Sequence, residues 1–259
     1  MRDASAAAVF LFLLIAPLGY ARQAPEAAPP AATSASVNPQ GLEQKSAAPA
    51  QTAEQKPPQR LFHIIPLYNV TFEKNPPALT PAGKFRIFAR SITDPYTILS
   101  TAGQAGLEQD QNHFPAYGQG AAGYGKRFGA DYGDAAIGGF LTTFAFPSLL
   151  HEDPRYFRRG EGGIRRRLGH AMANTFVTPT DSRRRSFNWA NMLGRLTARS
   201  VAVSYYPAAQ RTSPRVFAGF GYSLGNSIVD NVFNEFGPDV ERWLFKQIGR
   251  DATGRRVPN

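Results

Sequence analysis

The residues best suited to chemistry form one short string, His151-Glu152-Asp153-Pro154-Arg155. A histidine and a carboxylate at a helix end can form an acid–base pair or bind a metal. The spacing fits no established zinc pattern, so we expect no metal and no cofactor. Asp153-Pro154 can also cap a turn, and Arg155 can pair with Glu152. The sequence favours this structural role, with a catalytic site of His151, Asp153 and Arg155 as the alternative.

Arginine clusters give the second signal. The segment from His151 to Arg215 carries 13 arginines against four acidic residues, which accounts for most of the chain's formal net charge of +10. Its two triplets are Arg165, Arg166, Arg167 and Arg183, Arg184, Arg185. Such triplets form either an ordinary solvated basic face or a site for an anionic partner, because guanidinium groups bind phosphate in two-pronged contacts. An export signal at the amino terminus favours anionic lipid or another envelope component and argues against nucleic acid.

A glycine–aromatic ladder leads into the His151 string. Gly125, Gly129 and Gly133 recur every fourth residue, with an aromatic residue preceding each, so each set lies on one face of a helix. A glycine face lets another backbone approach closely. Gly221 and Gly225 repeat the device later in the chain. We therefore predict that these five glycines form helix-packing seams within one domain.

The elements that position these residues are helices with short polar connections. Asp94-Pro95 has the form of a helix N-cap followed by the first helical residue, and Gly237-Pro238-Asp239 is expected to break the last long helix. On the helix near residue 170, Ile164, Leu168, Ala171 and Met172 are expected on one side. The expected helices cover about 81–91, 96–110, 116–146, 164–177, 187–206, 215–236 and 240–248. The predicted fold class is all-α: a bundle of five to six helices with glycine-mediated close packing.

The amino-terminal part of the chain predicts export. Residues 1–21 contain an apolar run of signal-peptide length, followed by small residues that suit cleavage after Ala21. Residues 22–60 are rich in Ala, Pro and Gln and predict a disordered linker. We expect an extended segment at 61–82, a helical domain at 83–249 and a basic tail at 250–259. The chain has no cysteine, so packing must supply its stability.

The uncharged stretches at 135–150 and 216–229 are shorter than the roughly 20 residues of a membrane span. Buried core helices or interfacial helices suit them better, although glycine ladders also serve packing between membrane helices. Whether the helices insert into lipid stays open on this evidence.

The string from His151 to Phe157, followed by Tyr205-Tyr206-Pro207, resembles a family of exported bacterial proteins with the pattern H-x-D-P-R-Y-F…Y-Y-P. The resemblance covers about residues 146–236. Some members carry this segment behind a carboxypeptidase-regulatory-like β-domain, which this chain lacks. The family has no established activity, so the resemblance implies export and a helical domain and supplies no chemistry.

Together these features predict an exported, non-enzymatic helical protein of the periplasm or outer envelope. Its arginine-rich face would bind anionic lipid or another envelope component. The alternative is an envelope hydrolase with its site around His151, Asp153 and Arg155. The sequence leaves the oligomeric state open.

Overall fold

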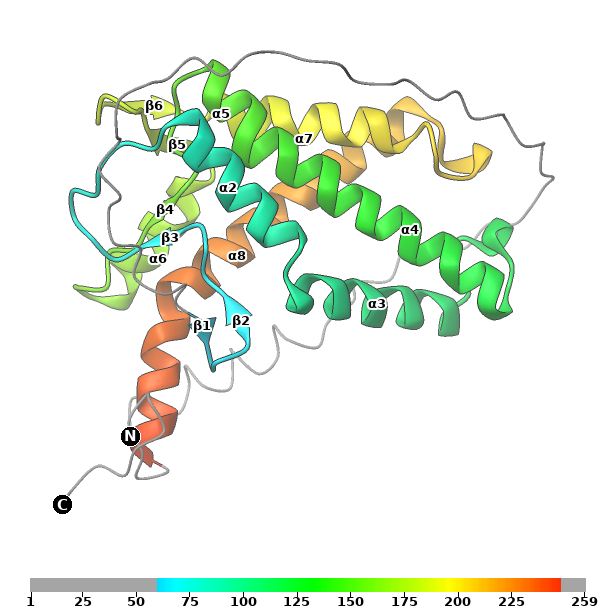
Figure 1. The fold of residues 1–259 in the computed structure, drawn as a ribbon, viewed down its shortest axis with the longest axis horizontal. Coiled ribbons are helices and arrows are strands. Elements are labelled where there is room, and N and C mark those ends of the chain that lie inside the picture. Colours follow the sequence, from blue (N-terminus) through cyan, green and yellow to red (C-terminus); the bar gives the residue numbers. More distant parts are fainter. Residues whose placement is uncertain (1–59, 248–259) are drawn as a thin grey trace, which may run out of the picture.

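The computed structural model describes residues 60–247 and is mostly helical (Figure 1). Six of its helices have eleven or more residues, which confirms the all-α fold class. The predicted signal peptide, nearly all of the predicted linker and the basic tail lie outside the described residues. The helical elements are α2 (Pro81–Ile92), α3 (Pro95–Asp110), η1 (Pro115–Tyr117), α4 (Gly120–Gly139), η2 (Phe140–Ala145), α5 (Phe146–Leu149), α6 (Ile164–Asn174), α7 (Trp189–Ala202), η3 (Ala208–Gln210) and α8 (Ser213–Gln247).

Three two-stranded pairs join the helices. β1 (Arg60–Leu61) and β2 (Ile65–Pro66) are antiparallel, as are β5 (Val177–Pro179) and β6 (Arg185–Phe187). β3 (Val70–Thr71) and β4 (Tyr156–Phe157) are parallel, so they connect the segment expected to be extended with the loop after α5. These pairs are too short to form a separate layer.

Local capping signals set where several helices begin. Thr80 accepts a bond from the backbone N of Gly83 at 3.1 Å, and Asp94 accepts one from the N of Tyr96 at 2.8 Å. Each is followed by a proline at the first helical position, where the missing N–H costs nothing. The capping predicted for Asp94-Pro95 is confirmed, and the helical part begins at residue 81, two residues before the expected boundary.

The helix expected over 116–146 begins later and is not uniform. Phe114 has a left-handed backbone with φ 52°, and Gly118 and Gly120 also have positive φ, so regular helix starts only at Gly120. Residues 140–145 then form a π-helix before Pro147. Because proline lacks an N–H, the carbonyl four residues earlier loses its helical donor, and the wider turn accommodates this.

The prediction of a helix break at Gly237-Pro238-Asp239 is wrong. Helix α8 continues through Pro238 to Gln247. Two arginines donate to the carbonyl of Glu235 in the turn that the proline disturbs: Arg158 Nε at 2.9 Å and Arg167 Nη2 at 2.7 Å. These tertiary contacts hold the turn next to Pro238 in place, and local sequence does not reveal them.

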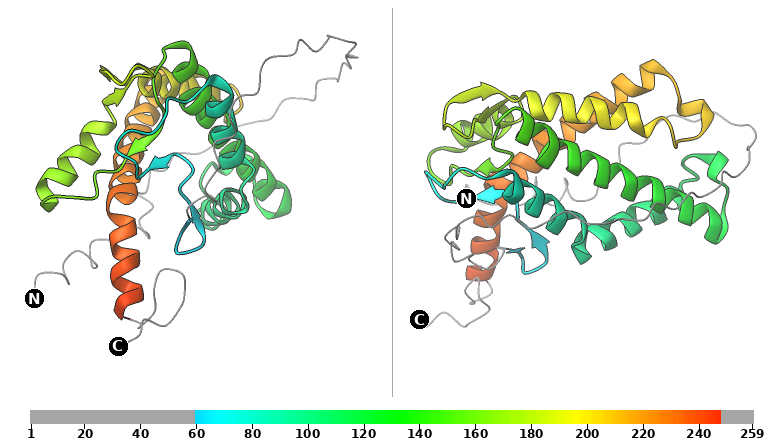
Figure 2. Two further views of the ribbon diagram at one scale, coloured as in Figure 1. Left: turned by 60° about the vertical axis from the view of Figure 1, so that its left-hand side comes forward. Right: turned by 45° about the horizontal axis from the view of Figure 1, so that its top comes forward.

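The helices pack in a chain of neighbours around α7 and α8. Helix α4 lies beside α3 on one side and α7 on the other, while α8 contacts both α6 and α7 (Figure 1). Turned by 60°, the molecule shows α6 on one side of α8 and α2, α3 and α4 on the other (Figure 2, left). Helix α6 thus covers α8 and leaves its own outer side free.

Glycine does not form the predicted seams. A Cβ added at Gly125, Gly129, Gly221 or Gly225 would meet no atom within 4 Å, and only Gly133 has a neighbour, the ring of Tyr205 at 3.8 Å. A period of four places residues on one face of a helix, but here that face is largely open.

Close helix packing occurs at other glycines. A Cβ at Gly194 of α7 would lie 2.8 Å from Thr142 Cγ2, where α7 crosses the π-helix, and one at Gly237 would lie 2.7 Å from Leu61 Cδ2. Both glycines are therefore required where another part of the chain approaches.

Charged side chains occupy much of the buried interior. Lys84, Arg127 and Glu235 have no exposed surface, and Asp153 and Glu152 are almost completely buried. Large apolar side chains, by contrast, are exposed on α3, α6, α7 and α8. Exposed apolar patches of this kind commonly mark binding surfaces, whereas single exposed apolar residues need no explanation.

Candidate functional site

The loop that follows α5 brings Asp153 and Arg155 together and leaves His151 apart from them. His151 has φ 54° and a side chain that is 83% exposed, and its Nδ1 lies 3.9 Å from Asp181. Asp153 is buried and accepts bonds from Arg155 Nε at 2.9 Å and Nη2 at 2.7 Å. The carboxylate that the acid–base alternative requires is therefore engaged by arginine rather than by His151.

Glu152 and Asp153 fasten this loop to the β5–β6 hairpin and to α7. Glu152 accepts bonds from the backbone N of Ala190 at 2.9 Å and of Trp189 at 3.2 Å, the first turn of α7. Burial raises the pKa of Glu152, and these two amide bonds oppose the rise. Thr178 Oγ1 donates to the carbonyl of Asp153 at 2.9 Å. The geometry thus gives the string a structural role, as turn and cap chemistry predicts.

Two of the six predicted anion-binding arginines are occupied internally, and for them the prediction is wrong. Arg167 is buried, and its Nε bonds Glu235 at 2.7 Å. Arg183 bonds Asp153 at 3.4 Å and also donates to the carbonyl of Pro76. Arg167 is thereby closed to an external anion, whereas Arg183 has internal partners and keeps a side chain that is 32% exposed.

Glu235 is the centre of the buried node that holds Arg167. Its carboxylate also accepts the backbone N–H groups of Arg159 and Gly160 and the hydroxyl of Tyr156, each at 2.9 Å. Burial alone would raise the pKa of Glu235, but the bond from Arg167 and these further donors lower it below its usual value. The node locks α6 and the loop after β4 onto α8.

The other four arginines of the two triplets are exposed. The guanidinium groups of Arg165, Arg166, Arg184 and Arg185 have no hydrogen bond or ion pair with any residue of the described part. They lie on α6 and on the β5–β6 hairpin, which are neighbours in the fold (Figure 1). These four side chains can reach an external anion.

An apolar stripe lies beside these arginines on α6. Ile164 is 66% exposed, and Leu168 and Met172 are also exposed, whereas Ala171 is fully buried. At 100° per residue all four lie within about 100° of one another, so they share one side of the helix as expected, and that side is buried at Ala171 and exposed at the other three. Each step of four residues turns a helix by about 40°, so Ile164, Leu168 and Met172 form one narrow band.

Further exposed apolar residues lie after α6, in the hairpin and at the start of α7. Phe176 follows the helix and is exposed, and its carbonyl accepts the backbone N–H of Asn188 at 2.8 Å. Phe187 and Trp189 are exposed and in contact, with ring centroids 4.8 Å apart. We call the exposed side of α6 and the hairpin the amphipathic surface; it comprises Ile164, Leu168, Met172, Phe176, Phe187, Trp189, Arg165, Arg166, Arg184 and Arg185.

A second polar cluster surrounds Asp134 of α4, and the sequence analysis assigns it no role. Asp134 accepts bonds from Tyr205, from Tyr206 at 3.1 Å and from Arg199 Nη1 at 2.9 Å. The signal that points here is the Tyr205-Tyr206-Pro207 string of the resemblance pattern. Burial and the Asp134 charge raise the pKa of both tyrosines, so their hydroxyls stay protonated and donate.

Beside Asp134, three buried polar atoms lack a hydrogen-bond partner among the described residues: Glu108 Oε2, Tyr117 Oη and Asp131 Oδ2. Burial, together with the charges of Glu108 and Asp134, raises the pKa of Asp131 to about 7. Burial also raises the pKa of Tyr117 to about 12. The cluster can therefore gain or lose a proton near neutral pH.

The described part of the chain contains neither a metal-binding cluster nor a helix that could cross a membrane. Within residues 60–247, histidine, aspartate and glutamate side chains nowhere gather in a group of three that could hold a metal ion. In the same residues, no helix combines the length and the apolar character that a membrane crossing requires.

Comparison with known proteins gives no match: no family model, no curated protein and no solved structure matches this chain. The resemblance to exported proteins with the H-x-D-P-R-Y-F…Y-Y-P pattern therefore stays a prediction. What the chain does has to be argued from its own surfaces and clusters.

Proposed function

We propose that this protein is an exported, non-enzymatic envelope protein that binds the anionic surface of a membrane through its amphipathic surface. The observation that carries the proposal is the apolar stripe of α6 and the hairpin, which lies beside four exposed arginines without internal partners. An interfacial helix has this composition, with apolar residues that enter the headgroup boundary and basic residues that meet lipid phosphates.

The expected binding free energies of the arginines and of the apolar stripe favour reversible association with a membrane. Each arginine close to an anionic membrane surface contributes about 1 kcal/mol, so four contribute about 4 kcal/mol. Burial of the exposed parts of Ile164, Leu168 and Met172 adds an apolar contribution at roughly 25 cal/mol per Å². A protein bound in this way associates with the leaflet and does not cross it.

The envelope-hydrolase alternative gains no support from the geometry. His151 faces solvent, and Asp153 is held by Arg155 in a buried ion pair. The hollow among α4, α7 and α8 is lined by none of the three residues.

Vesicle flotation of the secreted chain tests the proposal. We expect strong binding to vesicles that contain phosphatidylglycerol and weak binding to vesicles of phosphatidylcholine alone. The double variant Arg165→Gln/Arg166→Gln should lower binding to anionic vesicles about 30-fold, from about 1 kcal/mol for each charge. Leu168→Ser/Met172→Ser should lower binding to the same vesicles about tenfold or more by removing apolar contacts.

The matched control is Arg86→Gln/Arg215→Gln, which removes two exposed charges from α2 and α8. It should bind anionic vesicles nearly as well as the unchanged protein. Equal binding to neutral and anionic vesicles, or an equal loss in both arginine pairs, would overturn the assignment of this surface. Recovery of the mature protein in the cytosol on cell fractionation would overturn export.

A further inference from the structure

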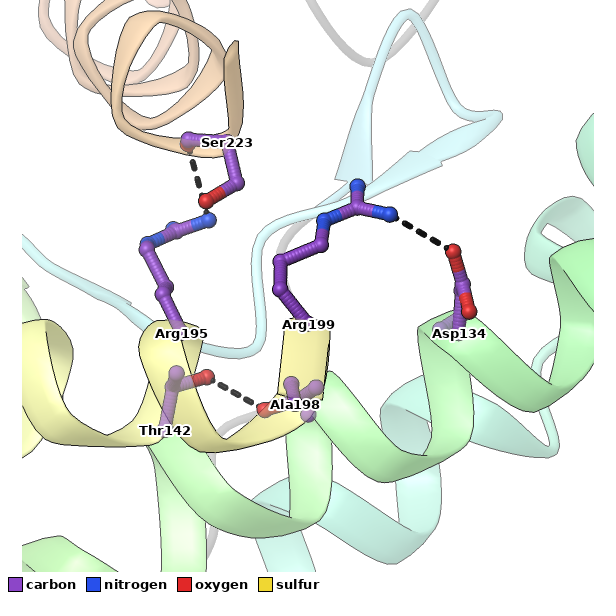
Figure 3. Close-up of a pocket in the computed structure, with 9 residues that line it drawn as sticks. Asp134, Thr142, Arg195, Ala198, Arg199 and Ser223 are labelled. Atoms are coloured by element: carbon purple, nitrogen blue, oxygen red, sulfur yellow. Dashed lines mark hydrogen bonds and ion pairs between the residues drawn. The ribbon is translucent and has the colours of Figure 1, made fainter. Parts of the chain in front are cut away.

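A hollow of about 250 Å³ lies between α4, α7 and α8 (Figure 3). Small residues on one wall make room for it, among them Ala135 and Gly138 of α4. Arg195 and Arg199, one turn apart on α7, supply its positive charge, and Asp134 lies at one end. None of these residues belongs to the amphipathic surface.

Arg195 carries a charge without a hydrogen-bonded counter-ion. Its Nε donates to Asn191 Oδ1 at 2.7 Å. Its Nη1 donates to the backbone carbonyl of Ser223, which also lines the hollow, at 2.9 Å (Figure 3). Both acceptors are neutral, and Nη2 makes no bond within the described residues. Burial of a charge is costly unless the charge is paired. The burial lowers the pKa of Arg195, in line with this cost.

The carboxylates near Arg195 do not neutralise it by direct contact. Asp134 is already bonded to Arg199, Tyr205 and Tyr206. Asp230 of α8 acts on Arg195 only at longer range, and burial raises the pKa of Asp230. Two guanidinium groups and one carboxylate line the hollow, so its lining carries an excess of positive charge.

We propose that this hollow binds a phosphoryl group between Arg195 and Arg199. Two guanidiniums on one helix face offer several N–H donors, and a tetrahedral anion with three or more oxygens can accept from both. The hydroxyls of Thr142 and Ser223 already donate to carbonyls of their own helices, so the arginines are the donors that remain. The shared ligand chemistry is a phosphate, either free or as the head of a phosphomonoester lipid.

The test uses the secreted chain and a variant that fills the hollow. A Cβ at Gly138 would meet no atom within 4 Å, so Gly138→Leu places a side chain in the hollow without removing any bond. Gly129→Leu is the matched control, because its Cβ is equally open, it lies on the same helix and it is outside the hollow. Both changes replace a helical glycine with a better helix former, so both variants should fold.

Calorimetry and thermal melts with inorganic phosphate measure the free ligand, with sodium chloride at equal ionic strength as the salt control. Flotation with phosphatidate vesicles measures the lipid headgroup. We expect one of these probes to bind the unchanged protein and Gly129→Leu alike. The same probe should bind Gly138→Leu at least about tenfold more weakly, because the leucine keeps the phosphoryl group from its charged hydrogen bonds with the arginines. Arg195→Met should show the same loss.

Which probe responds identifies the source of the phosphate. If Gly138→Leu weakens the binding of inorganic phosphate, the ligand is free phosphate. If it weakens only the binding of phosphatidate vesicles, the ligand is a lipid headgroup. Equal binding of both probes by the unchanged protein and Gly138→Leu, or no binding of either probe, would overturn the proposal. The variant Arg165→Gln/Arg166→Gln should leave the binding of inorganic phosphate unchanged while it weakens vesicle binding, so failure here is distinct from failure of the membrane surface.

Discussion

The change Asp131→Asn should make the protein more stable at alkaline pH and should flatten its dependence on pH. Asp131 lies on α4 with Oδ2 buried and without a partner in the described part. Burial, then the charges of Glu108 and Asp134, raise its pKa to about 7, while His113 and Arg127 oppose the rise. Asparagine has nearly the same shape and carries no charge at any pH.

The sign follows from linkage between protonation and folding. The folded pKa of Asp131, about 7, is above the ordinary aspartate value of 3.8 that applies to the unfolded chain, so the folded state binds the proton more tightly. The stability from this proton is fully present below the unfolded pKa and is lost as pH rises through 7. Between pH 5 and pH 8 the loss amounts to roughly 2.5 kcal/mol, at 1.36 kcal/mol for each unit.

Urea unfolding at several pH values measures this loss. The free energy of unfolding of Asp131→Asn, minus that of the unchanged protein, should rise by roughly 2.5 kcal/mol between pH 5 and pH 8. Asp110→Asn removes an exposed carboxylate from α3 and should change this difference far less. A difference for Asp131→Asn that stays constant over this range would refute the burial of an unpaired carboxyl in the cluster.

Two further changes test the interior. Glu235→Gln removes the buried carboxylate that pairs with Arg167 and leaves the partly exposed Asp239 as its counter-ion, so it should cost up to about 3–5 kcal/mol in thermal or urea unfolding, the range for broken buried pairs. Because the pKa of Glu235 is lowered, its contribution is present above the unfolded pKa and is lost as pH falls. Gly194→Ala should cost about 1–3 kcal/mol, since its Cβ would lie 2.8 Å from Thr142 Cγ2. Gly129→Ala, where the Cβ meets nothing, should stabilise by up to about 1 kcal/mol, and a loss at Gly129 equal to that at Gly194 would contradict this assignment of the packing glycines.

Signals that act within a few residues were predictable from the sequence. The cap at Asp94 needs only the amide of Tyr96, two residues away, and Pro95 supplies the required φ. Helix α8 could not be predicted in the same way. Its passage through Pro238 depends on Arg158 and Arg167, which lie about seventy residues earlier in the chain.

The glycine ladder shows what periodicity leaves undecided. Spacing by four predicts that Gly125, Gly129 and Gly133 share a face, but it does not say whether another helix covers that face. Gly194, which packs against the π-helix, is by contrast the single glycine of its helix. Its role depends on where α7 crosses Thr142, and no local pattern encodes that crossing.

The arginine triplet on α6 links the interior to the proposed membrane surface. Arg165, Arg166 and Arg167 are identical in type, yet each residue turns the helix by about 100°, so only Arg167 meets Glu235. That buried pair fixes the rotation of α6 against α8, and the fixed rotation directs Ile164 and its stripe outward. Loss of Glu235 should therefore weaken binding to anionic vesicles even where the charges of Arg165 and Arg166 are intact. A charge-only attraction would leave that binding unchanged, so vesicle flotation of folded Glu235→Gln separates an oriented surface from a diffuse basic one.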